Sequence, residues 1–380
     1  MLKTSIIFVS GCALIFFGCQ NNENDCIAGE VQSCPCLDAP DGVQTCAEDG
    51  KSFEPCQCGT GFGDGNVLEG SYTIANSQDL EKIRSFKEIT GNLTVSAAGL
   101  SALKLPNLTT IGGDLIVDKS DDLTSLEGLS NLTRIGGNFH LIKNASLEEV
   151  VGLENLESIG GNIYFHANTS LRSIDGLSNL KELKGNLWVF NNPAIVSLEG
   201  FTGLTEVGGH LYTWNNDSLR NLDGYRNIQK IGGGLCFSAD DLLEDVTGLS
   251  GIKHVHSDLH VFLASSLKSL EGLHNIHTVE GTVYIGFQKQ NVPMHNAALE
   301  NLDGLAGLAK VGKDLAIVFN ESLLDIEGLA NLQEVGEGIA IYDNPLLPSC
   351  QAQSLVDRLE QTGWDGLLLL DLNKDDECDG

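Results

Sequence analysis

Short apolar segments recur at a fixed spacing from residue 91 to near the end of the chain. A glycine, or Ser257, Lys313 or Glu337 in its place, precedes each segment at steps of 22 residues, then seven of 24, one of 32 and one of 24. The residue two places later is apolar in every repeat: Leu93, Leu115, Phe139, Ile163, Leu187, Leu211, Leu235, Leu259, Val283, Leu315 and Ile339. The position two further on is apolar in all repeats but one, which predicts strands with one buried face. Such a period is typical of stacked coils in a solenoid.

Two other positions mark corners of the predicted coil. Glycine recurs at one corner, where it takes the required backbone shape at low cost: Gly128, Gly152, Gly176, Gly200, Gly224, Gly248, Gly272, Gly304 and Gly328. Asparagine recurs at another, with Asp240 in the same place: Asn144, Asn168, Asn192, Asn216, Asn320 and Asn344. Stacked asparagines can satisfy turn backbone groups that neighbouring coils would otherwise bury unpaired. We therefore predict an all-β stack of about eleven 24-residue coils over residues 67–380.

Both ends of such a stack need a cover. Residues 77–88 predict a capping helix, because Leu80, Ile83 and Phe86 fall at helical spacing. A second helix is expected from Ser349 to residue 362, followed by a last strand at 367–370 that a Cys350–Cys378 bridge would tie back. The tail residues Asp371, Asn373, Asp375 and Asp376 begin like a calcium loop but lack its central Gly and closing Glu, which favours a solvated acidic tail.

The first residues predict an export signal. Lys3 provides a positive start, and residues 5–18 are apolar but too short to span a bilayer permanently. Gly18 followed by Cys19 resembles the lipobox of bacterial lipoproteins, so we predict that residues 1–18 are a signal peptide and that Cys19 is lipidated. In Gram-negative families Gln20, rather than Asp, after that Cys implies lipid anchoring in the outer membrane. The alternative is a plain secretory signal with an incidental cysteine.

Residues 19–58 are rich in cysteine and have no aliphatic periodicity. Six cysteines, Cys26, Cys34, Cys36, Cys46, Cys56 and Cys58, predict a small module held by disulfides, whose connectivity stays open. Zinc is the alternative ligand, but no histidine accompanies them and an exported context favours bridges. Residues 59–66 predict a glycine-rich linker. Cys236 is left over as the odd, unpaired cysteine.

Charge limits the possible partners. Against 22 Lys and Arg stand 52 Asp and Glu, so the net charge is −30. This excludes nucleic-acid binding through the surface field, because affinity for phosphates comes mainly from Lys and Arg. No set of residues predicts a cofactor or a metal site.

The repeat resembles a known family. Residues 147–168, LEEVVGLENLESIGGNIYFHAN, follow the pattern Leu-x-x-Leu-x-Gly-Leu-x-Asn-Leu-x-x-Ile-Gly-Gly-Asn-Leu-x-Val-x-x-Asn and are similar to the receptor L-domain family. The resemblance covers about residues 70–378 and implies a right-handed, leucine-rich β-helix, found in insulin and growth-factor receptors, fungal wall proteins and many bacterial lipoproteins. The receptor domains bind ligand on the face of their broad sheet. The resemblance therefore implies a binding face, but no individual contact.

Aromatic residues are concentrated on the predicted outer face of the strands. The two outward rows contain eight of the chain's 23 aromatic residues, against three in the two buried rows. The candidate ligand-binding residues are His140, Tyr164, His166, Trp188, Phe190, Tyr212, Trp214, His260, Phe262 and Tyr284. A contiguous exposed apolar strip is an expected interaction surface. The alternatives are that cross-strand stacking only stabilises the sheet, or that the cysteine module folds over it.

Three further features have weaker interpretations. The extra residues of the 32-residue step, 287–294, predict a loop at the end of the strip, with Lys289 as a rare cation. Loops inserted at one coil often lie at a binding face, and a neutral surface insertion is the alternative. Cys236, His260 and Asp258 have the residue types of a thiol-catalytic triad, but a flat sheet provides no oxyanion cleft. An acidic row could chelate cations, although a solvated corner is the favoured interpretation: Glu127, Asp175, Glu199, Asp223, Glu271, Asp303 and Glu327.

The sequence therefore favours a non-enzymatic protein of the cell envelope that binds a neutral glycan or a protein partner in adhesion or recognition. A structural envelope protein without a specific ligand is the alternative. An exposed-face hydrolase is a remote one, because the paired carboxylates that such enzymes need do not recur on this face.

Overall fold

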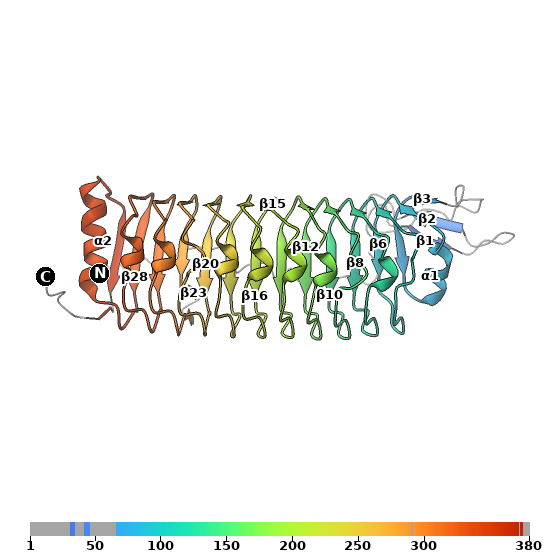
Figure 1. The fold of residues 1–380 in the computed structure, drawn as a ribbon, viewed down its shortest axis with the longest axis horizontal. Coiled ribbons are helices and arrows are strands. Elements are labelled where there is room, and N and C mark those ends of the chain that lie inside the picture. Colours follow the sequence, from blue (N-terminus) through green and yellow to red (C-terminus); the bar gives the residue numbers. More distant parts are fainter. Residues whose placement is uncertain (1–30, 35–41, 46–65, 290–291, 372, 375–380) are drawn as a thin grey trace.

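The chain forms an elongated stack of parallel strands (Figure 1). The computed structural model describes residues 31–34, 42–45, 66–289, 292–371, 373 and 374. The predicted all-β parallel β-helix is confirmed. Several predictions concern residues outside this description. They are the signal peptide, Cys19, residues 59–65 of the predicted linker 59–66, Cys378 and five of the module cysteines, Cys26, Cys36, Cys46, Cys56 and Cys58.

A 13-stranded sheet runs the length of the stack. Its strands are β4 (Tyr72–Ile74), β6 (Leu93–Val95), β8 (Leu115–Asp118), β10 (Phe139–Ile142), β12 (Ile163–His166), β14 (Leu187–Phe190), β16 (Leu211–Trp214), β18 (Leu235–Ser238), β20 (Leu259–Phe262), β22 (Val283–Ile285), β26 (Leu315–Val318), β28 (Gly338–Tyr342) and β29 (Leu367–Asp371). We call it the large sheet. Equivalent residues of successive coils pair directly, as in Phe139 with Leu115 and Ile163.

A second wall is built from two-residue strands in two sheets. The eight-stranded sheet contains β3 (Val67–Leu68), β5 (Glu88–Ile89), β7 (Thr110–Ile111), β9 (Arg134–Ile135), β11 (Ser158–Ile159), β13 (Glu182–Leu183), β15 (Glu206–Val207) and β17 (Lys230–Ile231). The four-stranded sheet contains β19 (His254–Val255), β21 (Thr278–Val279), β25 (Lys310–Val311) and β27 (Glu334–Val335). Each two-residue strand buries its second, aliphatic side chain.

The remaining corner is formed by 3-10 helices of one turn each. They are η2 (Glu127–Leu129), η3 (Asp175–Leu177), η4 (Glu199–Phe201), η5 (Asp223–Tyr225), η6 (Thr247–Leu249), η7 (Asp303–Leu305) and η8 (Glu327–Leu329). The middle residue of each is one of the predicted corner glycines. At Gly128 a Cβ atom would lie 1.2 Å from the carbonyl oxygen of Leu103 on the preceding coil. Glycine is required here by the close approach of two coils.

The asparagine corner is a buried ladder. Asn144 Nδ2 donates to Asn168 Oδ1 at 3.1 Å and to the Val117 carbonyl at 2.9 Å. The pattern repeats along the stack and satisfies buried backbone carbonyls of the strands. It also contains Ser120 and Asn296, both fully buried, which the repeat pattern does not predict.

Two longer helices lie at the two ends of the stack in Figure 1. Helix α1 (Ser77–Ile83) begins after Asn76, whose side chain accepts from the backbone N–H groups of Gln78 and Asp79. It is shorter than the predicted 77–88, because Glu88 instead pairs with Val67 and Thr110 in the second wall. Helix α2 (Ser349–Gln361) buries its apolar side, and β29 follows it.

Two hairpins complete the described chain. β1 (Val31–Cys34) pairs antiparallel with β2 (Gly42–Thr45), within the predicted cysteine module. β23 (Phe287–Lys289) pairs antiparallel with β24 (Val292–Met294), so the extra residues of the 32-residue step form a hairpin and not a plain loop. No helix among the described residues is both long and apolar enough to span a bilayer.

Candidate ligand-binding face of the large sheet

The outward side chains of the large sheet form two aligned rows. Direct pairing places Tyr164 between His140 and Trp188, and Tyr212 after Trp188. The second row aligns His166, Phe190 and Trp214 in the same way. Rungs lie about 4.8 Å apart, so aromatic side chains on successive rungs come into contact.

The rings of β12, β14 and β16 contact one another across the rungs. The ring centroids of His166 and Phe190 are 4.4 Å apart in a stacked arrangement, and those of Trp188 and Tyr212 are 6.4 Å apart. Tyr164 meets Phe190 edge to face at 4.8 Å. These contacts hold the rings in defined positions before any ligand arrives. All seven candidate side chains from β10 to β16 remain half-buried.

Burial keeps His140 and His166 uncharged at neutral pH. It lowers the pKa of His140 and of His166, and neighbouring charges and hydrogen bonds do not reverse the shift. Asn191 Nδ2 is 3.2 Å from His166 Nδ1. Since an amide nitrogen can only donate, His166 Nδ1 accepts this hydrogen bond and bears no hydrogen. The face therefore presents neutral aromatic groups.

His210 also contributes to this face and was not identified from the sequence. It lies just before β16, at a position occupied by Asn138, Asn162 and Asn186 on earlier coils. Its Nδ1 accepts from the Gly234 backbone N–H at 2.8 Å and lies 3.0 Å from the Tyr212 hydroxyl. A histidine that replaces asparagine in an otherwise regular row is the signal that could have identified it.

The predicted continuous strip from His140 to Tyr284 is not fully exposed, and this part of the prediction is wrong. His260, Phe262 and Tyr284 are only 2, 2 and 5% exposed. Phe287 of β23 lies over the last two, with ring centroids 5.4 Å from Phe262 and 5.5 Å from Tyr284. The β23–β24 hairpin thus contributes to a second hydrophobic cluster on the outer side of the large sheet, which also contains Cys236 and Ala316. The accessible aromatic face spans β10 to β16.

The disulfide at Cys236 rules out the thiol-catalytic triad, an interpretation that the sequence did not favour. Cys236 is disulfide-bonded, as is Cys350 in α2, so the expectation of an unpaired Cys236 is wrong. A disulfide sulfur offers no thiolate nucleophile. His260 Nε2 lies 3.9 Å from Asp258 Oδ2, which is beyond hydrogen-bond distance. The predicted partner of Cys350, Cys378, lies outside the described residues, and that pairing stays a prediction.

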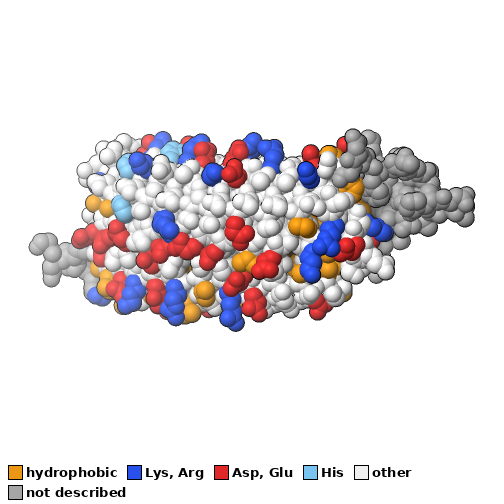
Figure 2. Space-filling view, turned by 45° about the vertical axis from the view of Figure 1, so that its right-hand side comes forward, with side chains coloured by type: hydrophobic (Ala, Val, Ile, Leu, Met, Phe, Trp, Pro, Cys, Tyr) orange, Lys and Arg blue, Asp and Glu red, His pale blue; other side chains and the backbone are white. Residues whose placement is uncertain are grey.

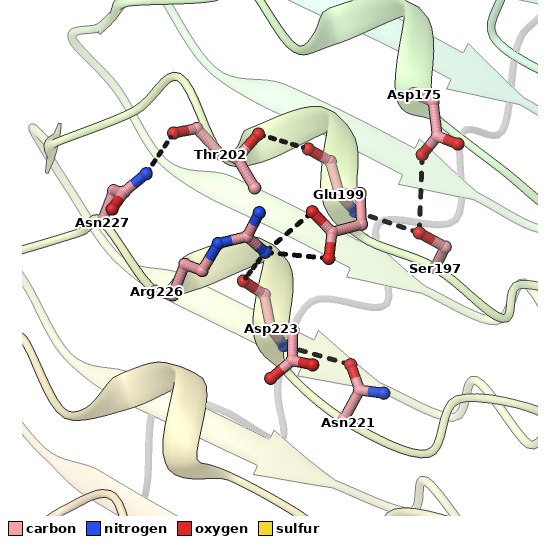
Figure 3. Close-up of polar contacts among 8 residues, drawn as sticks. All are labelled: Asp175, Ser197, Glu199, Thr202, Asn221, Asp223, Arg226 and Asn227. Carbon is pink, nitrogen blue, oxygen red and sulfur yellow. Dashed lines mark hydrogen bonds and ion pairs between the residues drawn. The ribbon is translucent and has the colours of Figure 1, made fainter.

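Six of the seven residues of the acidic row are the first residue of a 3-10 helix, and Glu271 lies in a turn at the equivalent position. Figure 2 shows carboxylates along the stack with lysine and arginine side chains among them. In Figure 3 the Arg226 guanidinium donates to both Glu199 carboxylate oxygens, at 2.8 and 2.7 Å, and to the Asp223 carbonyl. Asp175 accepts from Ser197 Oγ at 3.4 Å. These partners belong to the corner itself, which supports its interpretation as a solvated structural edge and not a chelating site.

A surface cavity of about 470 Å³ lies beside the β23–β24 hairpin. It is lined by Pro293, His295, Phe319, Glu321, Asp343 and Pro345. On the polar side of this cavity, His295 Nδ1 is 3.1 Å from Glu321 Oε1, and the two form an ion pair when the imidazole is protonated. Burial, then the nearby Asp371, raises the pKa of Asp343. Pro293 belongs to the predicted loop 287–294. The other five residues were not predicted as part of a site, because they come from loops of successive coils.

Comparison with known families adds one finding. Residues 64–175 match the family model of the receptor L domain. This part of the chain contains β3 to β12 and ends at Asp175, and the later coils continue with the same 24-residue spacing apart from the one step of 32 residues. No curated protein matches the chain significantly. The family match supports the resemblance to receptor L domains and suggests a ligand-binding or recognition role rather than an enzymatic one.

Proposed function

We propose that this protein is a recognition protein of the bacterial cell envelope that binds a neutral glycan or an extended protein segment on the aromatic face of β10 to β16. The observation that carries the proposal is the row of half-buried rings on successive rungs, centred on Trp188 and Trp214. Contiguous apolar surface of this kind is uncommon on a soluble domain unless it meets a partner. The family match supports a binding role.

The chemistry of the face favours a neutral ligand. Ring faces gain apolar contact area with sugars or peptide segments in a defined geometry. The net charge of −30 opposes anionic partners. The indole N–H of Trp188 is buried with no hydrogen-bond acceptor among the described residues. Because this N–H is not accessible from solvent, we expect Trp188 to contact a ligand through the face of its ring.

The test is a combined glycan and peptide array probed with the purified chain and with the double variant Trp188→Ala and Trp214→Ala. We expect binding of the wild type and a loss of at least tenfold in the double variant, with an unchanged far-UV spectrum because these side chains lie outside the core. The matched control changes Thr94 and Ser96 to Ala, in the same two rows at β6, and should bind normally.

The structural alternative makes a different prediction for the same experiment. If the rings serve only to stabilise the sheet, the double variant unfolds more easily and the wild type binds nothing on the array. A double variant that folds and binds as before would instead place recognition elsewhere, with the hairpin around Lys289 as the next candidate.

We propose further that Cys19 anchors the protein to the outer membrane through lipid. The support is the apolar run that ends at Gly18 and Cys19 in the sequence. Labelled fatty acid should enter the wild type and not the Cys19→Ala variant. Equal labelling of the two proteins would contradict the anchor, and export without any label would favour the plain secretory signal.

A further inference from the structure

A small cluster of metal-ligating side chains lies on the four-stranded sheet, separate from the aromatic face. His254, His256 and Glu280 each offer a donor atom, and these three atoms lie within 4.8 Å of one another. We propose that they bind a divalent late transition metal ion such as Zn²⁺. This inference does not depend on the proposed ligand-binding face.

The register of the sheet brings the three residues together. His254 begins β19 and His256 follows two residues later, so the period of two places both side chains on the same side. β19 pairs in parallel with β21, with His254 opposite Thr278. The same register continues one residue beyond the strands and places Glu280 beside His256 on the next rung. The cluster is therefore fixed by backbone pairing.

The hydrogen bond of His256 favours metal binding. Its Nδ1 lies 3.1 Å from the Ile231 carbonyl oxygen, and since a carbonyl only accepts, Nδ1 must bear the hydrogen. The lone pair of His256 is therefore on Nε2, the atom left for a metal ion. Metal-binding histidines commonly donate their other ring N–H to a backbone carbonyl in this way, which fixes the tautomer and the ring orientation.

The other two side chains already face one another. His254 Nε2 is 3.0 Å from Glu280 Oε1, and the ring centroids of His254 and His256 are 4.4 Å apart. Zn²⁺ bonds of about 2.0 to 2.2 Å require donor atoms roughly 3.3 Å apart in a tetrahedron. Modest rotation of these solvent-accessible side chains achieves that spacing. The ion would replace the direct His254–Glu280 contact.

The neighbouring charges do not oppose a cation. Lys230 and Lys310 are equivalent to His254 on other rungs, and each is paired with a carboxylate, Glu206 at 2.5 Å and Glu334 at 2.6 Å. Two imidazoles and one carboxylate suit Zn²⁺, Ni²⁺ or Cu²⁺, whereas Ca²⁺ and Mg²⁺ prefer oxygen ligands alone. Three protein ligands leave a fourth position for water or for a group of a bound partner.

The first test is calorimetric titration of the metal-free full chain with ZnCl₂. The wild type should bind one equivalent of Zn²⁺ more than the variant with His254→Ala and His256→Ala. Glu280→Gln should lower the affinity for that equivalent at least tenfold. The matched control, His274→Ala with His277→Ala, removes two other exposed histidines and should bind like the wild type. Equal stoichiometry and affinity in the wild type and the His254/His256 variant would overturn the proposal.

A second readout identifies the ligands directly. With one equivalent of Cu²⁺, electron paramagnetic resonance should show two coordinated nitrogens in the wild type and one in either His254→Asn or His256→Asn. These single changes are on the surface, and circular dichroism verifies that each variant is folded. A nitrogen count that is the same in all three proteins would contradict the assignment.

Discussion

Single residues repeated on neighbouring coils stabilise this stack. The asparagine ladder is the clearest case. The Asn168 side chain accepts from the Asn144 backbone N–H and donates to the Leu141 carbonyl of the preceding coil, and it also donates to the Asn192 side chain of the next coil. Asp240 occupies one ladder position, where its Oδ1 accepts from the Asn216 N–H at 2.7 Å. Its Oδ2 is buried with no hydrogen-bond partner among the described residues. Burial raises the pKa of Asp240 to about 8, so this carboxyl holds a proton at neutral pH.

Replacing Asp240 by Asn should stabilise the protein, most strongly at high pH. An unfolded Asp titrates near 3.8, and the folded one near 8. Between these values only the folded chain holds the proton, so the unfolding free energy of the wild type falls as pH rises through this window. We expect Asp240→Asn to raise the unfolding free energy by about 2 kcal/mol at pH 8, because it removes the unpaired carboxyl oxygen. It should also make the unfolding free energy less dependent on pH.

Urea unfolding at pH 5 and pH 8 measures this effect. Asp241→Asn is the matched control, since it removes a carboxylate from an exposed neighbour and should change the unfolding free energy by less than about 0.5 kcal/mol. A wild type that is as stable at pH 8 as at pH 5 would contradict the buried, protonated Asp240.

The sequence predicted most of the ladder but not all of it. The regular 24-residue step identified Asn144 through Asn216 and Asp240 as one row. Asn296 was missed because the 32-residue step moves it away from the position that a regular 24-residue step predicts. Ser120 was missed because it is a serine in a row of asparagines. The protonation of Asp240 depends on burial by neighbouring coils, which spacing alone does not reveal.

At the scale of elements, the repeat predicts strands and corners well and insertions poorly. The inward and outward faces of the strands were predictable because a period of two in a stack leaves one choice of face. The β23–β24 hairpin was predicted only as a loop, since its short strands contain Lys289 and Pro293 and no clear alternation. Its packing over Phe262 and Tyr284 is a contact between distant side chains, so the exposed strip was predicted too long.

The glycine corner can be tested by one substitution in the 3-10 helix η2. Gly128→Ala should lower the unfolding free energy by roughly 3 kcal/mol, because the new methyl group overlaps the Leu103 carbonyl. The control is Gly99→Ala, which has nothing within 4 Å but a φ of +79° and should cost only about 1 kcal/mol. If urea unfolding shows the same loss of unfolding free energy in both variants, contact with the preceding coil is not the reason that this corner requires glycine.

At the scale of the whole molecule, the stack places equivalent side chains one rung apart along its length. Each coil contacts mainly its neighbours, so one substitution pattern extends along a face without disturbing the core. The period and the resemblance to receptor L domains predicted this architecture, and the family match at residues 64–175 supports it. The cluster of His254, His256 and Glu280 was not predicted, because His256 and Glu280 are 24 residues apart in the chain and come together only through the register of β19 and β21.

The most direct measurement of the central claim is protection of tryptophan by ligand. The chain has three tryptophans, and Trp364→Phe leaves Trp188 and Trp214 on the aromatic face as the only reporters. With a ligand identified on the array, we predict that saturation lowers the acrylamide quenching constant of this variant at least twofold, because the bound ligand covers both indole rings. Saturated binding with an unchanged quenching constant would contradict recognition through the face of β10 to β16.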